Sequence, residues 1–316
     1  MVYSLTPDEV RERYGTLFCK GYYTIVDEEA GIAQVIEKCV AQGPGEWDAV
    51  NRRRTKGVIT GVSLKSGMVI TDVAVGEGEI SFGPVQADTG GQGIKALRIE
   101  GDRVRTTWYG IAGASVGIGA CMAQCSDVIC TEYPDDFVMG GAHRAHVDII
   151  SPKYVRLVIG IDDTDTKEKG ASWVTSLKLG TECPVGKFLE HRIIQLNPKA
   201  PNKTTNCCST AVSFAVKEED IPALIEFAVD FVRKESYSED TVMTVFKGLR
   251  IPEKLREFGE SCKTVLYKPE DAVRAAGESG VQIISVTGMK GVIGAVAAIG
   301  CFDTGEKAAG IPEDFQ

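Results

Sequence analysis

The sequence VRLVIGIDDTD, residues 155–165, decides the fold of this chain. Its apolar part, Val155 to Ile161, is short, rich in β-branched residues and free of turn residues, which is typical of a buried strand. Three carboxylates and a hydroxyl follow directly, namely Asp162, Asp163, Thr164 and Asp165. In α/β proteins, ligands bind at the carboxyl ends of strands. The stretch therefore predicts an α/β architecture with a polar site at the end of this strand.

The three aspartates are candidates for phosphate chemistry that depends on a metal ion. Carboxylates this close together repel one another unless positive charge lies between them. Oxygen ligands of this kind bind Mg²⁺, which carries nucleotide phosphates. We expect Asp162 and Asp165 to hold the metal, with Asp163 orienting a nucleophile or supporting the ligands, so that all three are catalytic candidates. Thr164 is a candidate for binding the cofactor. The alternative interpretation is an acidic turn that caps the following helix.

Length and composition limit the class of protein. The chain has 316 residues, enough for two domains of ordinary size, and its 43% hydrophobic and 25% charged residues are typical of a soluble globular protein. Its net charge of −9 argues against broad nucleic-acid binding, although a local basic patch remains possible. The sequence shows neither an apolar run of membrane-spanning length nor a signal peptide. We therefore expect a cytoplasmic protein with no membrane partner, for which nucleic acid is an unlikely partner.

Ten cysteines are a high number for such a chain, and in a reducing compartment they are expected to be thiols. The soft ligands Cys121, Cys125 and Cys130 occur in the same region as His143 and His146, which raises the possibility of a metal site. Their spacing matches no common metal-binding motif. The alternative is that these cysteines are small buried hydrophobic residues.

The pattern predicts a fold of class α/β (mixed α+β) with two domains. Residues 1–150 form an N-terminal domain of unknown role, in which short alternating runs between Gly57 and Trp108 predict an antiparallel sheet. A stripe of apolar residues predicts a helix over about 28–41. The segment of small residues from Gly110 to Cys121 is either a phosphate-binding loop or a helix packed closely on the sheet. Residues 151–316 alternate between strands and helices.

Two further segments of the second half follow predicted strands. The loop Asn197 to Asn206 is stiffened by two prolines, and its Asn197, Lys203, Thr204 and Asn206 are candidates for binding a triphosphate; the alternative is an exposed basic turn. The segment Gly288-x-x-Gly291-x-x-Gly294 opens a helix, where Lys290 and the backbone amides could bind an anion; the alternative is close packing of the helix on the sheet. If the strands are parallel, both segments share one sheet edge with the aspartates.

The second half resembles the kinase-like domain of the archaeal tRNA(Ile) agmatinylcytidine synthetase. The similarity covers about Tyr154 to Phe302. It rests on the sequences GIDDTD at 160–165, LNPKAPNKT at 196–204 and GVIGAVAAIG at 291–300. The resemblance implies a domain that binds ATP and Mg²⁺, activates a cytidine carbonyl by phosphorylation and phosphorylates its own threonine. Asn206 would replace an asparagine of that family, whose neighbouring arginine is missing here.

The resemblance has limits. Val174 falls at the position of the phosphorylated threonine, and only Ser172 or Thr175 could substitute for it. The nucleic-acid-binding domains of the synthetase have no counterpart in this sequence, so the tRNA activity does not carry over directly. The complete arrangement resembles methanogenesis marker protein 11.

Together these features indicate an enzyme of the phosphoryl-transfer type that depends on ATP and Mg²⁺ and serves methanogenesis. Its acceptor is an unknown small molecule or protein, and the chain is a possible homodimer. Two alternatives remain, a non-catalytic assembly factor gated by a nucleotide and a tRNA-modification protein. The proposed site predicts that the segments 162–165, 197–206 and 288–294 converge on one pocket.

Overall fold

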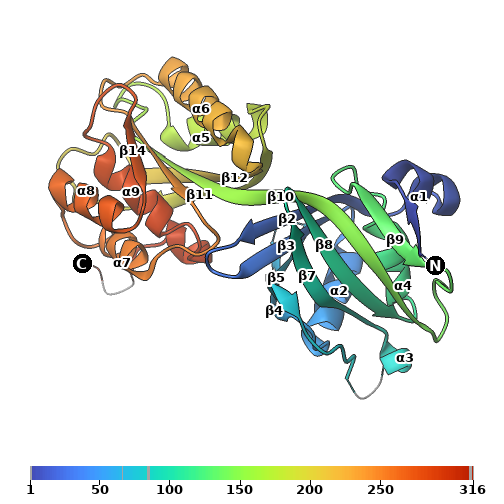
Figure 1. Cartoon of the computed structure of the whole chain (residues 1–316). Coiled ribbons are helices and arrows are strands. Elements are labelled where there is room, and N and C mark those ends of the chain that lie inside the picture. The colour runs from blue at the N-terminus through green and yellow to red at the C-terminus, as the bar shows by residue number, and fades with distance from the viewer. Residues whose placement is uncertain (1, 66, 84–85, 313–314, 316) are drawn as a thin grey trace. The chain divides into compact units, whose positions relative to one another are not determined.

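The computed structural model describes residues 2–65, 67–83, 86–312 and 315. The chain forms two compact units, Met1–Tyr154 and Val155–Gln316, each combining a sheet with helices (Figure 1). The predicted class, α/β (mixed α+β), is confirmed.

The N-terminal unit is built on antiparallel strands. Strands β4 (Ile59–Lys65), β5 (Met68–Ala74), β3 (Ile32–Cys39) and β2 (Cys19–Asp27) lie side by side in that order, and β7 (Gly91–Glu100) pairs with β8 (Arg103–Ile111). The long strand β10 (Arg144–Asp162) pairs with β8 and, over two residues, with β2. The remaining elements are β1 (Val2–Leu5), α1 (Pro7–Tyr14), α2 (Gln42–Arg54), β6 (Gly76–Glu77), α3 (Gln86–Thr89), α4 (Ala114–Val116), a π-helical turn (Gly117–Cys121) and β9 (Cys130–Pro134).

The helix predicted over residues 28–41 is wrong, because most of this segment is strand β3. β3 pairs with β2 on one side and with β5 on the other, so it is a central strand. Both of its faces are partly buried. Its apolar residues therefore do not alternate, and their spacing imitates the stripe of an amphipathic helix.

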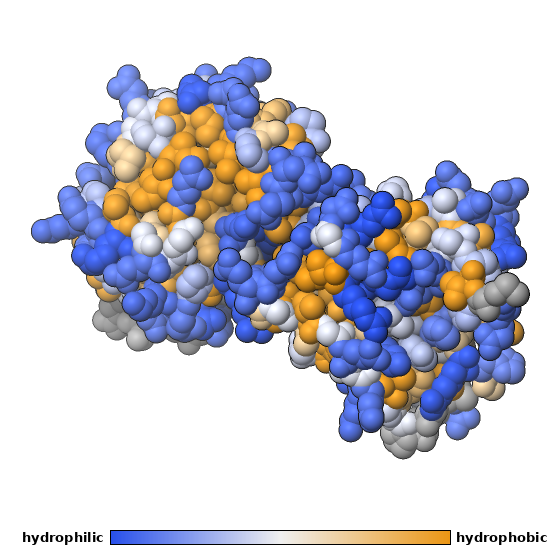
Figure 2. Space-filling view, in the orientation of Figure 1, coloured by the Kyte–Doolittle hydropathy of each residue, from blue (hydrophilic) through white to orange (hydrophobic). Residues whose placement is uncertain are grey.

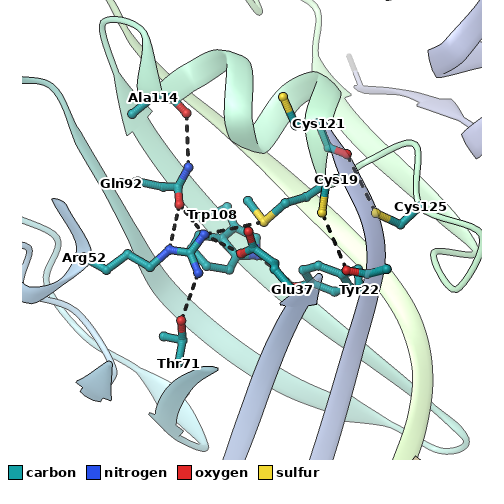
Figure 3. A network of polar contacts seen from close by, with 12 residues as sticks. Cys19, Tyr22, Glu37, Arg52, Thr71, Gln92, Trp108, Ala114, Cys121 and Cys125 are labelled. Carbon is teal, nitrogen blue, oxygen red and sulfur yellow. Dashed lines mark hydrogen bonds and ion pairs between the residues drawn. The ribbon is translucent and has the colours of Figure 1, made fainter. Parts of the chain in front are cut away.

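A buried arginine organises the core of the N-terminal unit (Figure 3). Arg52 on α2 is fully buried and forms an ion pair with Glu37 of β3, which is also buried. Its Nε donates to Gln92 Oε1 at 2.7 Å and its Nη1 donates to Thr71 Oγ1 at 2.9 Å. The guanidinium also lies 4.6 Å from the ring centroid of Trp108. These partners compensate the charge of Arg52 in the core, where an unpaired charge would destabilise the fold.

The C-terminal unit contains one sheet in the order β11-β12-β10-β13-β14. The strands are β11 (Lys187–Gln195), β12 (Cys208–Val216), the second part of β10, β13 (Val242–Lys247) and β14 (Gln282–Ser285). The helices are α5 (Ser172–Glu182), α6 (Ile221–Glu235), α7 (Glu253–Ser261), α8 (Pro269–Glu278) and α9 (Val292–Gly300), with short 3₁₀ turns at Glu218–Asp220 and Gly305–Ala309.

Neighbouring strands of this sheet are antiparallel, so the parallel sheet considered from the sequence does not occur. Strands β10, β11 and β14 nevertheless run in the same direction, because β12 and β13 lie between them. The register places Ile161 of β10 opposite Thr210 of β12 and Asp162 opposite Val242 of β13. The loops that follow β10, β11 and β14 therefore leave the sheet at one edge.

Helices cover both faces of the C-terminal sheet (Figure 1). Leu157, Ile159 and Ile161 of β10 share a core with residues of α5 and α6, whereas Val158 packs in a second core with residues of α7, α8 and α9. Gly160 lies on the second face. A Cβ at Gly160 would overlap the carbonyl oxygen of Ala295, so α9 approaches the strand more closely than any larger residue would allow.

The visible face of the C-terminal unit carries a broad area of hydrophobic residues framed by hydrophilic ones (Figure 2). Among the described residues, none of the helices has the length and apolar character that a membrane crossing requires.

Candidate functional site

Asp162, the last residue of β10, lies against the first turn of α9. Its Oδ2 occupies the space that a Cβ at Gly294 would need. A Cβ at Gly291 would come within 2.9 Å of the carbonyl oxygen of Asp162 and 3.1 Å of the Cβ of Asp163. Two glycines of the segment 288–294 therefore let the start of α9 approach the acidic loop. The start of α9 and the carboxylates lie at the same edge of the sheet. The amide of Gly291 donates to Asp240 O at 3.2 Å and that of Val292 to Met289 O at 3.3 Å, whereas in the described part of the chain the amides of Ile293 and Gly294 have no such partner.

Asp163 adopts a left-handed backbone conformation, with φ of 56°. Its carbonyl oxygen accepts a hydrogen bond of 2.7 Å from the hydroxyl of Thr241, the residue that precedes β13. A non-glycine residue with positive φ persists only where its surroundings enforce it. Here the hydroxyl of Thr241 and the contact with Gly291 hold the backbone of Asp163 in this conformation. The turn points the side chains of the consecutive aspartates in different directions.

Asp165 is bound by two hydroxyls from different segments. The Oγ of Ser172, at the start of α5, donates to Asp165 Oδ1 at 3.0 Å, and Thr204 Oγ1 donates to Asp165 Oδ2 at 3.0 Å. The Ser172 Oγ also accepts from the backbone amide of Thr164 at 3.1 Å. The loop 197–206 thus reaches the acidic loop through Thr204, and the three segments meet at one edge.

The site is strongly electronegative. Burial raises the pKa of Asp162 well above its usual range, and the nearby charge of Asp163 raises it further. Burial, followed by the charges of Asp165 and Asp240, raises the pKa of Asp163 to about 6. No lysine, arginine or histidine in the described part of the chain forms an ion pair with Asp162, Asp163 or Asp165. This charge distribution would attract a cation.

The donor set fits Mg²⁺ held jointly with a phosphate. Asp162 and Asp165 offer hard oxygen ligands, as Mg²⁺ prefers. Among the residues that the structure describes, no three carboxylate, histidine or cysteine side chains are grouped closely enough to hold a metal ion alone. Mg²⁺ is usually bound by one or two carboxylates together with waters and substrate phosphates. By its exposed area the residue Asp162 is partly accessible to solvent, while its carboxylate packs against α9.

Several predicted binding residues have other partners. Thr164 is buried, and its hydroxyl donates to Ser172 at 3.1 Å. Asn197 is buried. Its Nδ2 donates to the carbonyl oxygen of Thr264 and its Oδ1 accepts from the backbone amide of Lys199, both at 2.9 Å. Both residues therefore shape their loops.

The two predicted lysines are exposed. Lys290 forms an ion pair with Asp240 at 2.5 Å, and Lys203 donates to the carbonyl oxygen of Pro198. Asn206 is also exposed, and its carbonyl oxygen accepts from Gln195 Nε2 at 3.0 Å. In the described part of the chain, none of the three forms a hydrogen bond or ion pair with Asp162, Asp163 or Asp165, although the charge of Lys290 acts to lower the pKa of Asp163.

Sequence reasoning missed Asp240 and Thr241, and it considered Ser172 only as a substitute for a missing threonine. Asp240 and Thr241 stand just before β13, whose first residue lies opposite Asp162. The available signal was the pair Asp240-Thr241 directly before a β-branched run, but only the antiparallel pairing of β13 with β10 brings it to the site.

The cysteine-rich region of the N-terminal unit is part of its core. Cys121 and Cys125 are buried, and Cys125 Sγ donates to the carbonyl oxygen of Cys121 at 3.8 Å. His146 stacks on Tyr109, with ring centroids 5.0 Å apart. The small-residue segment around them is a short helical stretch, and a Cβ at Gly119 would overlap the ring of Phe137, so its glycines serve close packing.

Comparison with known proteins identifies a full-length relative. The chain is 31% identical over 301 residues to the uncharacterized protein MJ0921 of Methanocaldococcus jannaschii, a match covering 94% of this chain and 98% of that protein. The chain belongs to the MJ0921 family. The resemblance to methanogenesis marker protein 11 is not shown by these comparisons.

The C-terminal unit of this MJ0921-family protein also matches another group. Residues 158–288 match the family model of the TiaS TCKD domain. TiaS, the 2-agmatinylcytidine synthetase of an isoleucine tRNA, is 33% identical over 153 residues in Thermococcus sibiricus and 30% identical over 157 residues in Pyrobaculum neutrophilum. The matches cover 46–47% of this chain but only 35–36% of the synthetases, about a third of their length. The resemblance of this half to the synthetase is therefore confirmed.

Two solved structures resemble about half of the MJ0921-family chain. The crystal structure of TiaS in complex with its isoleucine tRNA and ATP has a TM-score of 0.42 and 23% identity, covering 46% of this chain and 36% of that one. The crystal structure of apo TiaS has a TM-score of 0.39 and 24% identity, covering 46% and 35%.

The expectation that nucleic acid is an unlikely partner is contradicted by these relatives. Proteins that share the C-terminal unit are named as synthetases that act on an isoleucine tRNA. The expectation rested on the net charge of the whole chain, and a net charge does not describe the local surface on which a nucleic acid binds.

Proposed function

We propose that this protein is an ATP- and Mg²⁺-dependent enzyme that transfers a phosphoryl group during the modification of a tRNA. The observation that carries the proposal is the contact between the Asp162 carboxylate and the start of α9 at Gly294. It joins a cation-attracting group to a helix start that can bind phosphate. The match of residues 158–288 to the TiaS TCKD domain supports the same chemistry.

The residues have distinct roles in this proposal. Asp162 and Asp165 would hold Mg²⁺, which neutralises phosphate charge when it is bound. The amides of Ile293 and Gly294, in the first turn of α9, would bind phosphate oxygens. Thr204 and Ser172 position Asp165 through their hydroxyls. This division fits phosphoryl transfer, in which catalysis consists mainly of positioning and electrostatic stabilisation.

The tRNA substrate is supported by the relatives. The synthetases that share this unit are named for an isoleucine tRNA. The chain covers about a third of those proteins, so it would bind its RNA with residues outside the matched region.

Titration calorimetry with ATP and Mg²⁺, combined with a transfer assay using ATP labelled at the γ-phosphate, tests the proposal. Asp162→Asn removes the charge but keeps the side-chain size. We expect it to weaken Mg²⁺-dependent ATP binding at least about tenfold and to abolish label transfer to tRNA, because a carboxylate on the metal is lost. Asp230→Asn on the exposed face of α6 is the matched control and should change neither property.

The two measurements separate the competing functions. Unchanged ATP affinity in Asp162→Asn would remove this residue from the site. Tight ATP binding by the wild type, with no label on tRNA and no free phosphate, would instead indicate a nucleotide-gated assembly factor.

A further inference from the structure

A basic stretch of this acidic chain places several cations on the surface of the N-terminal unit. Residues 49–71 contain five lysines and arginines and no aspartate or glutamate, whereas the chain as a whole has a net charge of −9. The stretch runs from the second half of α2 through β4 into β5. Of its basic residues, Arg52 is buried in the core network, and Arg53, Arg54 and Lys56 are exposed.

The exposed cations at the end of α2 are not neutralised by carboxylates. Arg53 donates through Nε and Nη2 to the carbonyl oxygen of Val62 at 3.2 and 3.1 Å. Arg54 donates to Thr89 Oγ1 at 2.8 Å and to Gly90 O at 3.4 Å. In the described part of the chain, no ion pair involves these two arginines or Lys56. The neutral partners hold the guanidinium groups in place and leave their charge available to an anion.

An exposed aromatic ring lies beside these cations. Trp47 is 45% exposed and precedes Arg54 by two helical turns on the outer face of α2. A Cβ at Gly90 would lie 3.1 Å from the Trp47 ring, so the ring packs on the backbone there. Arg54 binds the carbonyl oxygen of the same Gly90. The indole and the guanidinium are thus neighbours, and both are anchored to one loop.

We infer that this surface, formed by Trp47, Arg53, Arg54 and Lys56, binds an unpaired segment of the RNA substrate. The inference rests on the proposed function. Arginine and lysine side chains contact phosphates, and an aromatic ring that is supported by the protein and open to solvent can stack on an unpaired base. The C-terminal charge of the α2 helix dipole explains basic residues in its last turn. It does not explain the exposed indole or the lack of carboxylate partners.

Fluorescence anisotropy of the full-length protein with an end-labelled transcript of the isoleucine tRNA tests this inference. We expect Trp47→Ala to weaken binding about tenfold through lost stacking, and Trp47→Phe to retain most of the affinity. Removing the three charges together, with Arg53→Gln, Arg54→Gln and Lys56→Gln, should weaken binding further. It should also reduce the salt dependence by about 0.7–0.9 per lost phosphate contact.

A matched charge control lies on the other unit. Arg233→Gln with Lys234→Gln removes two exposed cations from the last turn of α6 and should leave RNA binding unchanged. Lys56→Gln alone tests the charge contribution if the triple variant does not fold, since in the described part of the chain the exposed Lys56 side chain forms no hydrogen bond or ion pair. ATP binding should be unaffected in all of these variants.

Each outcome bears on a different claim. If the wild type binds the tRNA but the Trp47 and charge variants bind equally well, the surface is wrong and the proposed function stands. If the wild type binds no tRNA with or without ATP, the tRNA function and the surface are both wrong. Equal weakening by the α6 control would show a nonspecific charge effect and would also overturn the surface.

Discussion

The carboxylate of Asp162 and the α-carbon of Gly294 are in direct contact, so Oδ2 of the aspartate fills the space that any side chain at position 294 would need. The contact joins the end of a central strand to the first turn of the helix that packs on it. A methyl group at this position would displace either the carboxylate or the helix.

We predict that Gly294→Ala lowers the free energy of unfolding by about 1–3 kcal/mol through overpacking and weakens ATP binding. Calorimetric titration and thermal unfolding measure the two effects. Gly277→Ala in α8 is the control, because a Cβ there meets no atom within 4 Å. That substitution should stabilise the helix by about 0.5–1 kcal/mol. Equal behaviour of the two variants would contradict the contact.

Ser172→Ala should weaken ATP binding and lower the free energy of unfolding by about 1–3 kcal/mol, because it leaves the buried amide of Thr164 without its acceptor and removes one of the two hydroxyls that donate to Asp165. Urea unfolding and calorimetry check both effects. Thr181→Ala near the end of α5 removes an exposed hydroxyl that donates only to carbonyl oxygens of its own helix. Its effect on stability should stay within about 0.5 kcal/mol.

Arg52→Met should destabilise the protein by about 3–5 kcal/mol, because it strands the carboxylate of Glu37 in the core without its partner. Adding Glu37→Leu should recover part of the loss. The exposed pair of Arg98 with Glu77 provides the comparison, since Arg98→Met should cost less than about 1 kcal/mol. Equal effects of Arg52→Met and Arg98→Met in urea unfolding would show that the buried ion pair is not structurally important.

His191 should make stability depend on pH between about 6.5 and 4. Burial lowers its pKa to about 4 from an ordinary value of 6.5, so between these values the unfolded chain binds a proton that the folded protein does not. The free energy of unfolding should therefore fall as the pH falls through this window, by about 1–2 kcal/mol after allowance for partial exposure. His191→Gln should flatten the dependence, whereas parallel curves for the two proteins would disprove it.

Much of the C-terminal unit could be predicted because its signals are local. The strand at 155–161 and the helix from Ser172 follow from runs of apolar residues and flanking turn residues, and the structure contains both. The direction of neighbouring strands could not be predicted, because the length of a connecting loop does not determine which strand pairs with which. The three loops converge nevertheless, because β10, β11 and β14 run in the same direction and are separated by β12 and β13, which run in the opposite direction.

The rest of the site depends on contacts between distant residues. Asp240 and Thr241 reach the acidic loop only because β13 pairs with β10. The side chain of Asn197 stabilises its own loop because it donates a hydrogen bond to the carbonyl oxygen of Thr264. In the N-terminal unit, the spacing of apolar residues in β3 imitates a helix because this strand has neighbours on both sides. A single sequence carries no record of such pairings.

The bare α-carbon of Gly160 sets how deeply α9 sits on its strand, since the carbonyl oxygen of Ala295 takes the place of a side chain. The depth of the helix also sets the distance between its leading amides and the aspartates. That spacing is therefore established as the chain folds, before any nucleotide arrives, and a ligand would not have to spend binding energy on assembling it. A larger residue at position 160 would displace α9 and its leading amides. It would therefore weaken ligand binding, although residue 160 itself lies buried under the helix.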